Sequence, residues 1–433
     1  MSEARKKKVL MFGWEFPPHI SGGLGTACFG LTSGLIEHGM DVLFVVPKLF
    51  GKEDNDKFKF VSASDVEVNF SDDQFSENLK KISYLQIHSH IVPYVAPEEF
   101  LKSKDLDVQE LVNNSKNSSA KFAFTGKYGK DLLDEVSKYA VVAMQVAKDQ
   151  EFDIIHAHDW LTFPAAIMAK EISGKQLVVH IHATEFDRSG EHVNQDVYNL
   201  ERRGIEAADR VVCVSRLTRR ILIDKYGVAP DKVFVVHNGV VAKPKIVYPA
   251  SKLPNRKIVT FLGRITFQKG PDYFVNAAKR LLTIMPDVHF VMAGSGDMHL
   301  QLIEKVAEMK MSSRFHFTGF LNFEETNALF GMTDIYVMPS VSEPFGITPL
   351  EAMRTGVPVI ISKQSGVAEV LDNAVKIDFW DEQAVADAIQ GLLEHPEIAK
   401  KLASNGSGEV EELKWEYAAL KLKEIYLDLL KNK

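Results

Sequence analysis

The 433-residue sequence has only two cysteines, and its apolar stretches are short. Cys28 and Cys213 allow one disulfide at most, and each stands in an apolar segment, so we expect buried free thiols in a reducing cytosol. The basic N-terminus precedes an apolar run of only about six residues, fewer than a signal peptide needs. Residues 16–36 carry no charge, but their Pro, Gly, His, Ser and Thr make a poor membrane span. These absences predict a cytoplasmic protein without stable membrane association.

An excess of basic residues is also missing. The chain has 51 Lys and Arg against 58 Asp and Glu, a net charge of −7, which disfavours nucleic acid as a partner. It contains neither the G-x-G-x-x-G pattern of dinucleotide-binding proteins nor the G-x-x-x-x-G-K-[ST] pattern of P-loops. A chain of this length exceeds what one hydrophobic core supports, so we expect two domains.

Continuous apolar runs, each the length of a strand, alternate with helical periods along most of the chain. Strands that are apolar on both faces are typical of parallel sheets covered by helices. The pattern therefore predicts an α/β protein with two doubly wound, Rossmann-like sheets. The first series of strands is expected at 9–12, 41–47, 152–158, 177–183, 210–215 and 233–238, and the second at 257–263, 288–294, 315–320, 335–340 and 357–362.

Three segments depart from this alternation. Residues 241–257 contain three prolines and little periodicity, so we interpret them as a linker between domains 1–242 and 243–411. Residues 50–125 are polar and irregular, and their Ser/Asn-rich part predicts a mobile surface insertion. From Gly408 onward the pattern predicts one long amphipathic helix that caps one domain or joins both.

Chemically distinctive residues of the first half follow its strands. In open parallel sheets, ligands bind beyond the carboxyl ends of the strands. Gly22, Gly23 and Gly25 open a helix, where glycines let backbone amides approach an anion. The segments HAHDW (156–160) and HIHATEFDRSG (180–190) bring many titratable groups to two further strand ends. His156 and His158 would share a strand face, but without other ligands nearby we expect a core or loop role rather than a metal site.

The second half offers cations and amides in the corresponding places. Arg264 and Lys269 stand five residues apart in a loop that suits a diphosphate, and we expect Lys269 to face solvent when no donor is bound. Thr348 and Glu351 form a capping-box pattern with a proline at the first helical position, which gives Glu351 a possible structural role. Glu343 stands just upstream of the amides at this helix start.

Together these motifs resemble the retaining GT-B glycosyltransferases, and among them the bacterial and archaeal glycogen (starch) synthases and related members of glycosyltransferase family 4. The resemblance rests on EFPPHISGGLG, HAHDW, HATEFDRSG, VVHNGV, GRITFQKG and EPFGITPLE, and it spans nearly the whole chain except 50–125. It implies a GT-B fold, two Rossmann-like domains facing across a cleft, with the terminal helix (about 412–433) crossing back to the first domain. One departure is plain: His19-Ile20-Ser21 replace the Lys-Thr that usually precedes Gly-Gly-Leu, which leaves ADP- versus UDP-glucose open.

The resemblance also implies roles for individual residues. As catalytic residues it implies His182, Arg264, Lys269 and Glu343. As further donor-binding residues it implies Gly22, Gly23, Gly294, Phe320, Leu321, Phe345, Gly346, Ile347, Thr348 and Glu351. As acceptor-binding residues it implies Glu15, His158, Asp159 and Glu185. No cofactor and no metal are expected, because Arg264 and Lys269 neutralise the diphosphate.

These roles predict transfer of glucose from ADP- or UDP-glucose to the 4-hydroxyl of an α-1,4-glucan by front-face substitution. The nearest alternative is a family 4 transferase with a lipid or a small sugar or polyol phosphate as acceptor. A more distant one is an inactive regulator that binds glucan or nucleotide, which the four catalytic candidates together disfavour. The nucleotide base, the acceptor length and the oligomeric state stay open.

Overall fold

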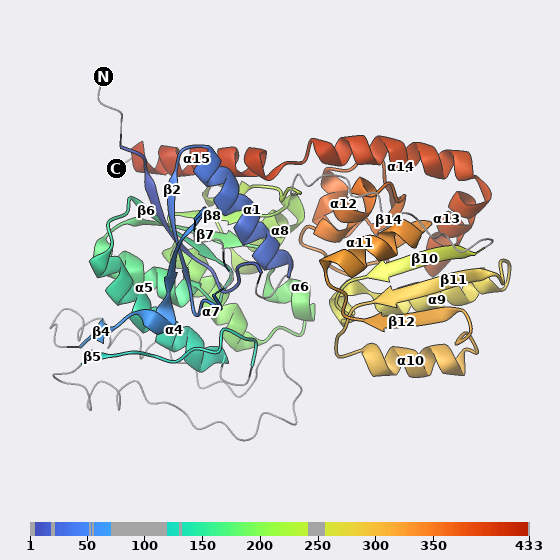
Figure 1. The fold of residues 1–433 in the computed structure, drawn as a ribbon, viewed down its shortest axis with the longest axis horizontal. Helices are drawn as coiled ribbons and strands as arrows, with labels where there is room; N and C mark the ends of the chain where they lie inside the picture. The colour runs from blue at the N-terminus through green and yellow to red at the C-terminus, as the bar shows by residue number, and fades with distance from the viewer. Residues whose placement is uncertain are drawn as a thin grey trace.

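The fold consists of two parallel sheets, each covered by helices on both faces and lying side by side in the molecule (Figure 1). The computed structural model describes residues 5–18, 22–51, 53, 56–70, 119–129, 132–240 and 256–431. The residues 19–21, most of the predicted insertion and nearly all of the predicted linker lie outside this range. The domain boundary at 242 therefore stays a prediction.

The first sheet has seven strands in the order β3-β2-β1-β6-β7-β8-β9, and every neighbouring pair is parallel. The central strands are almost wholly buried, as their continuous apolar sequences predict. The strands are β1 (Lys8–Phe12), β2 (Asp41–Val46), β3 (Lys59–Ser62), β6 (Ile154–His158), β7 (Gln176–Ile181), β8 (Arg210–Cys213) and β9 (Val233–Val235).

The second sheet has six strands in the order β12-β11-β10-β13-β14-β15, again all parallel. In both sheets the order reverses beside the first strand, which is the arrangement of doubly wound folds. The strands are β10 (Lys257–Leu262), β11 (Val288–Ala293), β12 (Phe315–Gly319), β13 (Ile335–Met338), β14 (Val359–Ser362) and β15 (Val375–Ile377).

Helices connect the parallel strands, as a crossover requires. In the first half they are α1 (Gly23–Glu37), α4 (Leu132–Asp149), α5 (Phe163–Ser173), α6 (Glu185–Ser189), α7 (Gln195–Ala207) and α8 (Arg216–Tyr226). In the second half they are α9 (Pro271–Leu282), α10 (His299–Glu308), α11 (Phe323–Met332), α12 (Ile347–Arg354), α13 (Glu382–Glu394) and α14 (Pro396–Glu411), and α15 (Trp415–Lys431) follows. No helix within these described residues is long and apolar enough to cross a membrane.

The predicted single helix from Gly408 onward is wrong. The chain forms two helices instead, α14 on the second half and α15 on the first, which run along one edge of the molecule (Figure 1). Val240 lies in a β-bridge with Lys414, and its N–H donates to Leu413 O at 2.8 Å, so the break between the helices is held to the first half.

The prediction that residues 50–125 are irregular is wrong for their described parts, while the Ser/Asn-rich part, interpreted as a surface insertion, lies mostly outside the described residues. Residues 59–62 form β3, and the short antiparallel strands β4 (Val68–Asn69) and β5 (Ser119–Ala120) pair beside α4. Phe70, Phe122 and Phe124 are buried in the main core of the first half. Aromatic side chains spaced along a polar sequence therefore fasten this segment to the domain.

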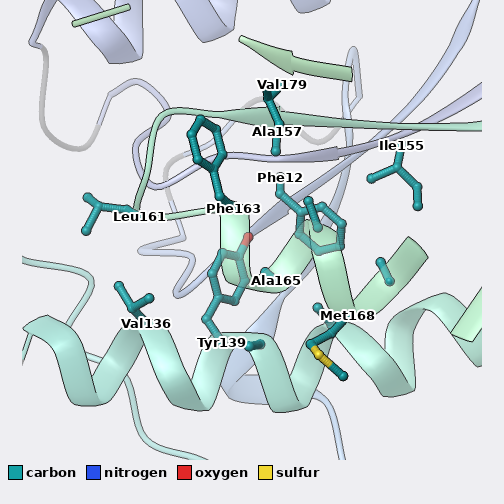
Figure 2. Packing of buried hydrophobic residues seen from close by; sticks show 14 of the residues in the cluster. Phe12, Val136, Tyr139, Ile155, Ala157, Leu161, Phe163, Ala165, Met168 and Val179 are labelled. Carbon is teal, nitrogen blue, oxygen red and sulfur yellow. The ribbon is translucent and has the colours of Figure 1, made fainter. Parts of the chain in front are cut away.

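The largest core lies between the first sheet and the helices α4, α5 and α7. Figure 2 shows Tyr139 rising from α4 toward Phe12 of β1 and Phe163 of α5, with Val136 and Met168 beside it. The Tyr139 hydroxyl is buried and donates to Val45 O at 2.7 Å, which satisfies a group that would be costly to bury unpaired. This hydrogen bond ties α4 to the end of β2, next to β1 in the sheet.

The opposite face of the first sheet is covered by α1 and α15, which approach closely because α1 carries glycines at positions 30 and 34. A Cβ at Gly30 would overlap the Trp415 ring, and one at Gly34 would lie 2.6 Å from Ala419 Cβ. The two glycines thus form the surface on which α15 rests.

Gly30→Ala is expected to lower the free energy of unfolding by about 1–3 kcal/mol, because the added methyl overpacks the contact with Trp415. The matched control is Gly391→Ala, since Gly391 also lies inside a helix but a Cβ there meets nothing within 4 Å. The control should gain up to about 1 kcal/mol from helix propensity alone. Chemical denaturation of both variants tests this, and a gain at both positions would contradict the close α1–α15 packing.

Candidate active site

A cleft of about 590 Å³ opens between the carboxyl ends of the two sheets. Its first-half wall comes from the loops after β1, β6 and β7, and its second-half wall from the loops after β10, β11, β12 and β13. Most of the predicted site residues line it: Glu15, Gly22, Gly23, Asp159, His182, Arg264, Lys269, Gly294, Phe320, Leu321, Glu343, Phe345, Gly346, Ile347 and Thr348. The topology thus gathers these segments into one place, as the strand-end rule predicts.

The second-half wall carries the predicted cations. Arg264 is exposed in the loop after β10, and Lys269 ends a short 3₁₀ turn, Phe267–Lys269. The expectation of a solvent-facing Lys269 is wrong, because its ammonium pairs with the Glu343 carboxylate and the two side chains are only 20% and 8% exposed. Glu343 is itself held by backbone bonds, donating to Gln364 O and accepting from Gly366 N. The two predicted catalytic residues therefore form one preorganised unit.

Helix α12 begins in the cleft wall, but not in the predicted manner. Its N-cap is Gly346, with φ 100°, and no side chain caps the helix, so the predicted capping box at Thr348 and Glu351 is wrong. The first turn also contains no acidic residue. The free amides and the positive end of the helix dipole are therefore available to an anion in the cleft.

Close backbone approach explains the glycine in the loop after β11. Gly294 has φ +129°, which side-chain-bearing residues rarely adopt, and a Cβ there would overlap the carbonyl of Gly263 after β10. Its N–H donates to Gly319 O at 2.8 Å. Gly294 therefore lets three strand ends converge at the floor of the cleft.

The first-half wall centres on a buried carboxylate, Glu15. Burial raises its pKa, against the lowering effects of the Tyr128 hydroxyl, the Gly25 backbone and the Arg264 charge across the cleft. Tyr128 donates to Glu15 Oε1, and a Cβ on Gly22 would lie 3.2 Å from Glu15 Oε2. Glu15 thus supports the glycine turn that starts α1, a helix with no side-chain cap and no acid in its first turn.

Asp159 and His182 stand beside this turn. Asp159 has φ 58°, and its Oδ1 accepts the His182 N–H at 2.7 Å. Burial raises the pKa of Asp159 to about 7 and lowers that of His182 to about 3, so the imidazole is neutral at pH 7. A neutral imidazole in the wall suits contacts with sugar hydroxyls rather than with phosphate.

Three predicted residues do not line the cleft. His158 is fully buried behind it, with Nδ1 2.9 Å from His182 Nε2. Glu185 is buried and pairs with Arg188. Glu351 lies in the second turn of α12, outside the lining. Of these, His158 and Glu185 support lining residues instead of facing a ligand.

Other lining residues were not predicted. Tyr128 follows the irregular segment 50–125 and lies far from Glu15 along the chain, so its approach to Glu15 had no local signal. Arg188 stands within HATEFDRSG, and the acidic residues of this motif could have indicated that Arg188 belongs to the site. Trp160, Gln268 and Ser295 adjoin predicted residues along the chain and complete the walls.

Comparisons with known proteins match this arrangement. The family profile "Glycosyltransferase Family 4" matches residues 129–243, and "Glycosyl transferases group 1" matches 245–408. The α-maltose-1-phosphate synthase of Mycolicibacterium smegmatis is 31% identical over 310 residues, which cover 63% of this chain and 78% of that protein. The chain belongs to glycosyltransferase family 4.

This family 4 transferase is also similar to a glycogen synthase of Mycobacterium tuberculosis, 24% identical over 430 residues that cover 97% of this chain and 94% of the relative. Among solved structures, HepE of Anabaena in complex with UDP and glucose aligns with a TM-score of 0.65 and 18% identity, covering 98% of this chain and 100% of that one. The predicted GT-B fold is thereby confirmed, and the protein is a nucleotide-sugar glycosyltransferase.

Proposed function

We propose that this enzyme is a retaining glucosyltransferase that moves glucose from ADP- or UDP-glucose to the non-reducing end of an α-1,4-glucan. The observation that carries the proposal is the contrast between the two cleft walls. The second-half wall holds two cations and the start of α12, and the first-half wall holds two carboxylates beside Tyr128.

The donor assignment follows from the second-half wall. Arg264, Lys269 and the first amides of α12 surround one region of the cleft, where a diphosphate would meet both charge and hydrogen-bond donors. The Gly22–Gly23 turn brings the start of α1 to the same cleft. As the bond to glucose breaks, these groups would stabilise the charge that develops on the leaving nucleotide.

The acceptor assignment follows from the first-half wall. Glu15 and Asp159 supply carboxylates that accept from hydroxyls, while Tyr128, which is partly exposed, supplies aromatic surface for a sugar ring. Among the described first-half lining residues the cation is Arg188, and it is already paired with Glu185 and Glu201. A phosphorylated acceptor would face these carboxylates on a wall whose described cation is already paired, so the wall favours a neutral glucan.

The proposed retention of configuration rests on the state of the carboxylates. Three line the described cleft, and each is engaged: Glu15 with Tyr128, Asp159 with the His182 N–H, and Glu343 with Lys269. A covalent intermediate would require one of them to attack the sugar. Front-face substitution needs none, because the leaving phosphate can take the proton of the acceptor hydroxyl.

The second candidate is transfer to a small sugar phosphate. It is supported by the similarity to a protein named α-maltose-1-phosphate synthase, a name that describes a phosphorylated disaccharide product. The paired state of Arg188 argues against it.

We expect maltoheptaose to be lengthened with either ADP- or UDP-glucose, and glucose 1-phosphate to remain unglucosylated. Mass spectrometry of the products identifies the acceptor, and proton NMR of the new anomeric centre establishes its configuration. Conversion of glucose 1-phosphate with unextended maltoheptaose would favour the second candidate. A β-linked product would contradict retention while leaving the acceptor assignment in place.

A further inference from the structure

Four histidines lie together behind the cleft, on one face of the first sheet. His156 and His158 alternate along β6, and His180 in β7 alternates with His182 directly after that strand, so the two pairs point the same way. Strand pairing sets His158 beside His180. His156, His158 and His180 are fully buried under α1 and α15. The proposed glycosyl transfer uses only His182.

Some of the ring nitrogens in this cluster have a hydrogen-bond partner, and others have none. His156 Nδ1 lies 2.8 Å from the Tyr426 hydroxyl of α15, and His158 Nδ1 lies 2.9 Å from His182 Nε2. The Nε2 atoms of His156 and His158 have no partner, and neither has either ring nitrogen of His180. Leaving so many polar atoms buried and unpaired costs about 1–3 kcal/mol each, so the cluster calls for a ligand.

We propose that His156, His158 and His180 form a binding site for one divalent transition-metal ion of the zinc class. One ring nitrogen from each residue lies within 4.8 Å of the other two. Zn²⁺ bonds to imidazole are about 2.0–2.1 Å, so the three donor nitrogens would have to approach to about 4 Å or less when an ion binds. Three imidazoles suit Zn²⁺, Co²⁺, Ni²⁺ or Cu²⁺ rather than Mg²⁺ or Ca²⁺.

The surroundings supply the outer contacts that such sites have. A metal-bound histidine commonly donates its other ring N–H to an acceptor, which fixes the tautomer. With the ion on the other ring nitrogen of each residue, His156 Nδ1 would donate to the Tyr426 oxygen and His158 Nδ1 to His182 Nε2. The ion would therefore hold β6, β7 and α15 together and place the proton of the cleft residue His182 on its Nδ1.

The third ligand explains why the sequence did not predict this site. HAHDW offers two histidines on one strand face, which alone make a weak site. His180 comes from the next strand, and only the β6–β7 register brings it opposite His158.

The test is metal analysis of the full chain, produced in zinc-supplemented medium without a polyhistidine tag. We expect about one zinc ion per chain by plasma mass spectrometry. After removal by a chelator, reloading with Co²⁺ should give the visible absorption of a low-symmetry site, and saturating Zn²⁺ should raise the melting temperature by several degrees. Less than a tenth of an ion per chain, both as isolated and after reloading, would overturn the proposal.

Variants separate this site from adventitious binding. His180→Phe keeps the ring volume and should lose the ion and the cobalt spectrum. His289→Gln is the matched control, because it breaks the other stacked histidine pair, His289–His316, and should retain one ion. Equal metal content in wild type and His180→Phe would refute the site.

A milder variant serves if His180→Phe does not fold. Tyr426→Phe keeps all three ligands but removes the acceptor of the His156 Nδ1 proton. Zinc affinity should fall about 10- to 100-fold, as loss of an outer-shell partner predicts. An unchanged affinity would show that any bound zinc lies elsewhere.

Discussion

Lys269→Ala should reduce turnover about 10²- to 10³-fold, the usual effect of removing one preorganised charge that meets a developing anion. Lys269 lies in the cleft wall beside the amides of α12, where we place the donor diphosphate. Because its contact strengthens as the leaving group separates, the loss should appear in kcat more than in KM. Steady-state kinetics with the donor at several concentrations would measure both.

The same substitution should also destabilise the protein, contrary to what a solvent-facing lysine would do. Lys269 pairs with Glu343, whose side chain is only 8% exposed, so its removal leaves a largely buried carboxylate without its cation. We expect a loss of about 1–3 kcal/mol, less than for a fully buried pair because Lys269 is 20% exposed.

A double variant separates the two effects. Lys269→Ala with Glu343→Gln removes the unpaired charge, so most of the stability should return while turnover stays low. Denaturation curves and rates on both variants would show this. Near-normal turnover in Lys269→Ala would mean that the diphosphate is held elsewhere in the cleft.

Arg188→Met should lower the free energy of unfolding by about 3–5 kcal/mol, the range for breaking a buried ion pair. Arg188 is 10% exposed and pairs with Glu185 and Glu201, which are each 2% exposed. Tyr226 donates to the second Glu201 oxygen, so the acid is fixed in place and cannot turn to solvent. The variant leaves two buried carboxylates without a cation.

The pH dependence of this loss has a definite sign. Burial already raises the pKa of Glu201 to about 7, and Arg188 opposes that rise. Without Arg188 the pKa rises further, and a raised carboxyl pKa favours the folded state only where the group is protonated. The deficit relative to wild type should therefore be larger near about pH 9 than near about pH 6.

The control for Arg188→Met is Arg202→Met, which removes an arginine that pairs with Glu206 at the surface. These side chains are 55% and 59% exposed, and such pairs contribute little, so the change should stay within about 0.5 kcal/mol. A loss of similar size in both variants, measured by urea denaturation, would contradict the special role of the buried network.

Much of the fold could be predicted because buried parallel strands have a strong local signature. Strands such as β1, β6 and β11 are mainly apolar and buried, and each was expected within two residues of its observed bounds. The edge strands β3 and β15 were missed, since they are short and only partly buried. Their existence depends on a neighbouring strand with free backbone groups, which their own residues do not encode.

Helix ends show the same limit. The pattern at Thr348 and Glu351 satisfies a capping box locally, yet α12 starts at Ile347. The N-cap is Gly346, two residues before the predicted cap Thr348, and its φ of 100° is one that residues with a side chain rarely adopt. The turn at this glycine sets the start of the helix, so the cap preference of Thr348, worth about 1 kcal/mol, does not decide it.

The sequence by itself determined the two parallel sheets and most of the segments that line the cleft. It could do so because strand periodicity is local and ligands of parallel sheets collect at strand carboxyl ends. Only the tertiary structure decided the pairing of Lys269 with Glu343, the burial of Arg188 between two acids, and the meeting of His180 with His156 and His158. These three features depend on burial and on contacts between distant segments. The pKa of a charged group and the energy of its ion pairs follow from those spatial contacts rather than from its neighbours along the chain.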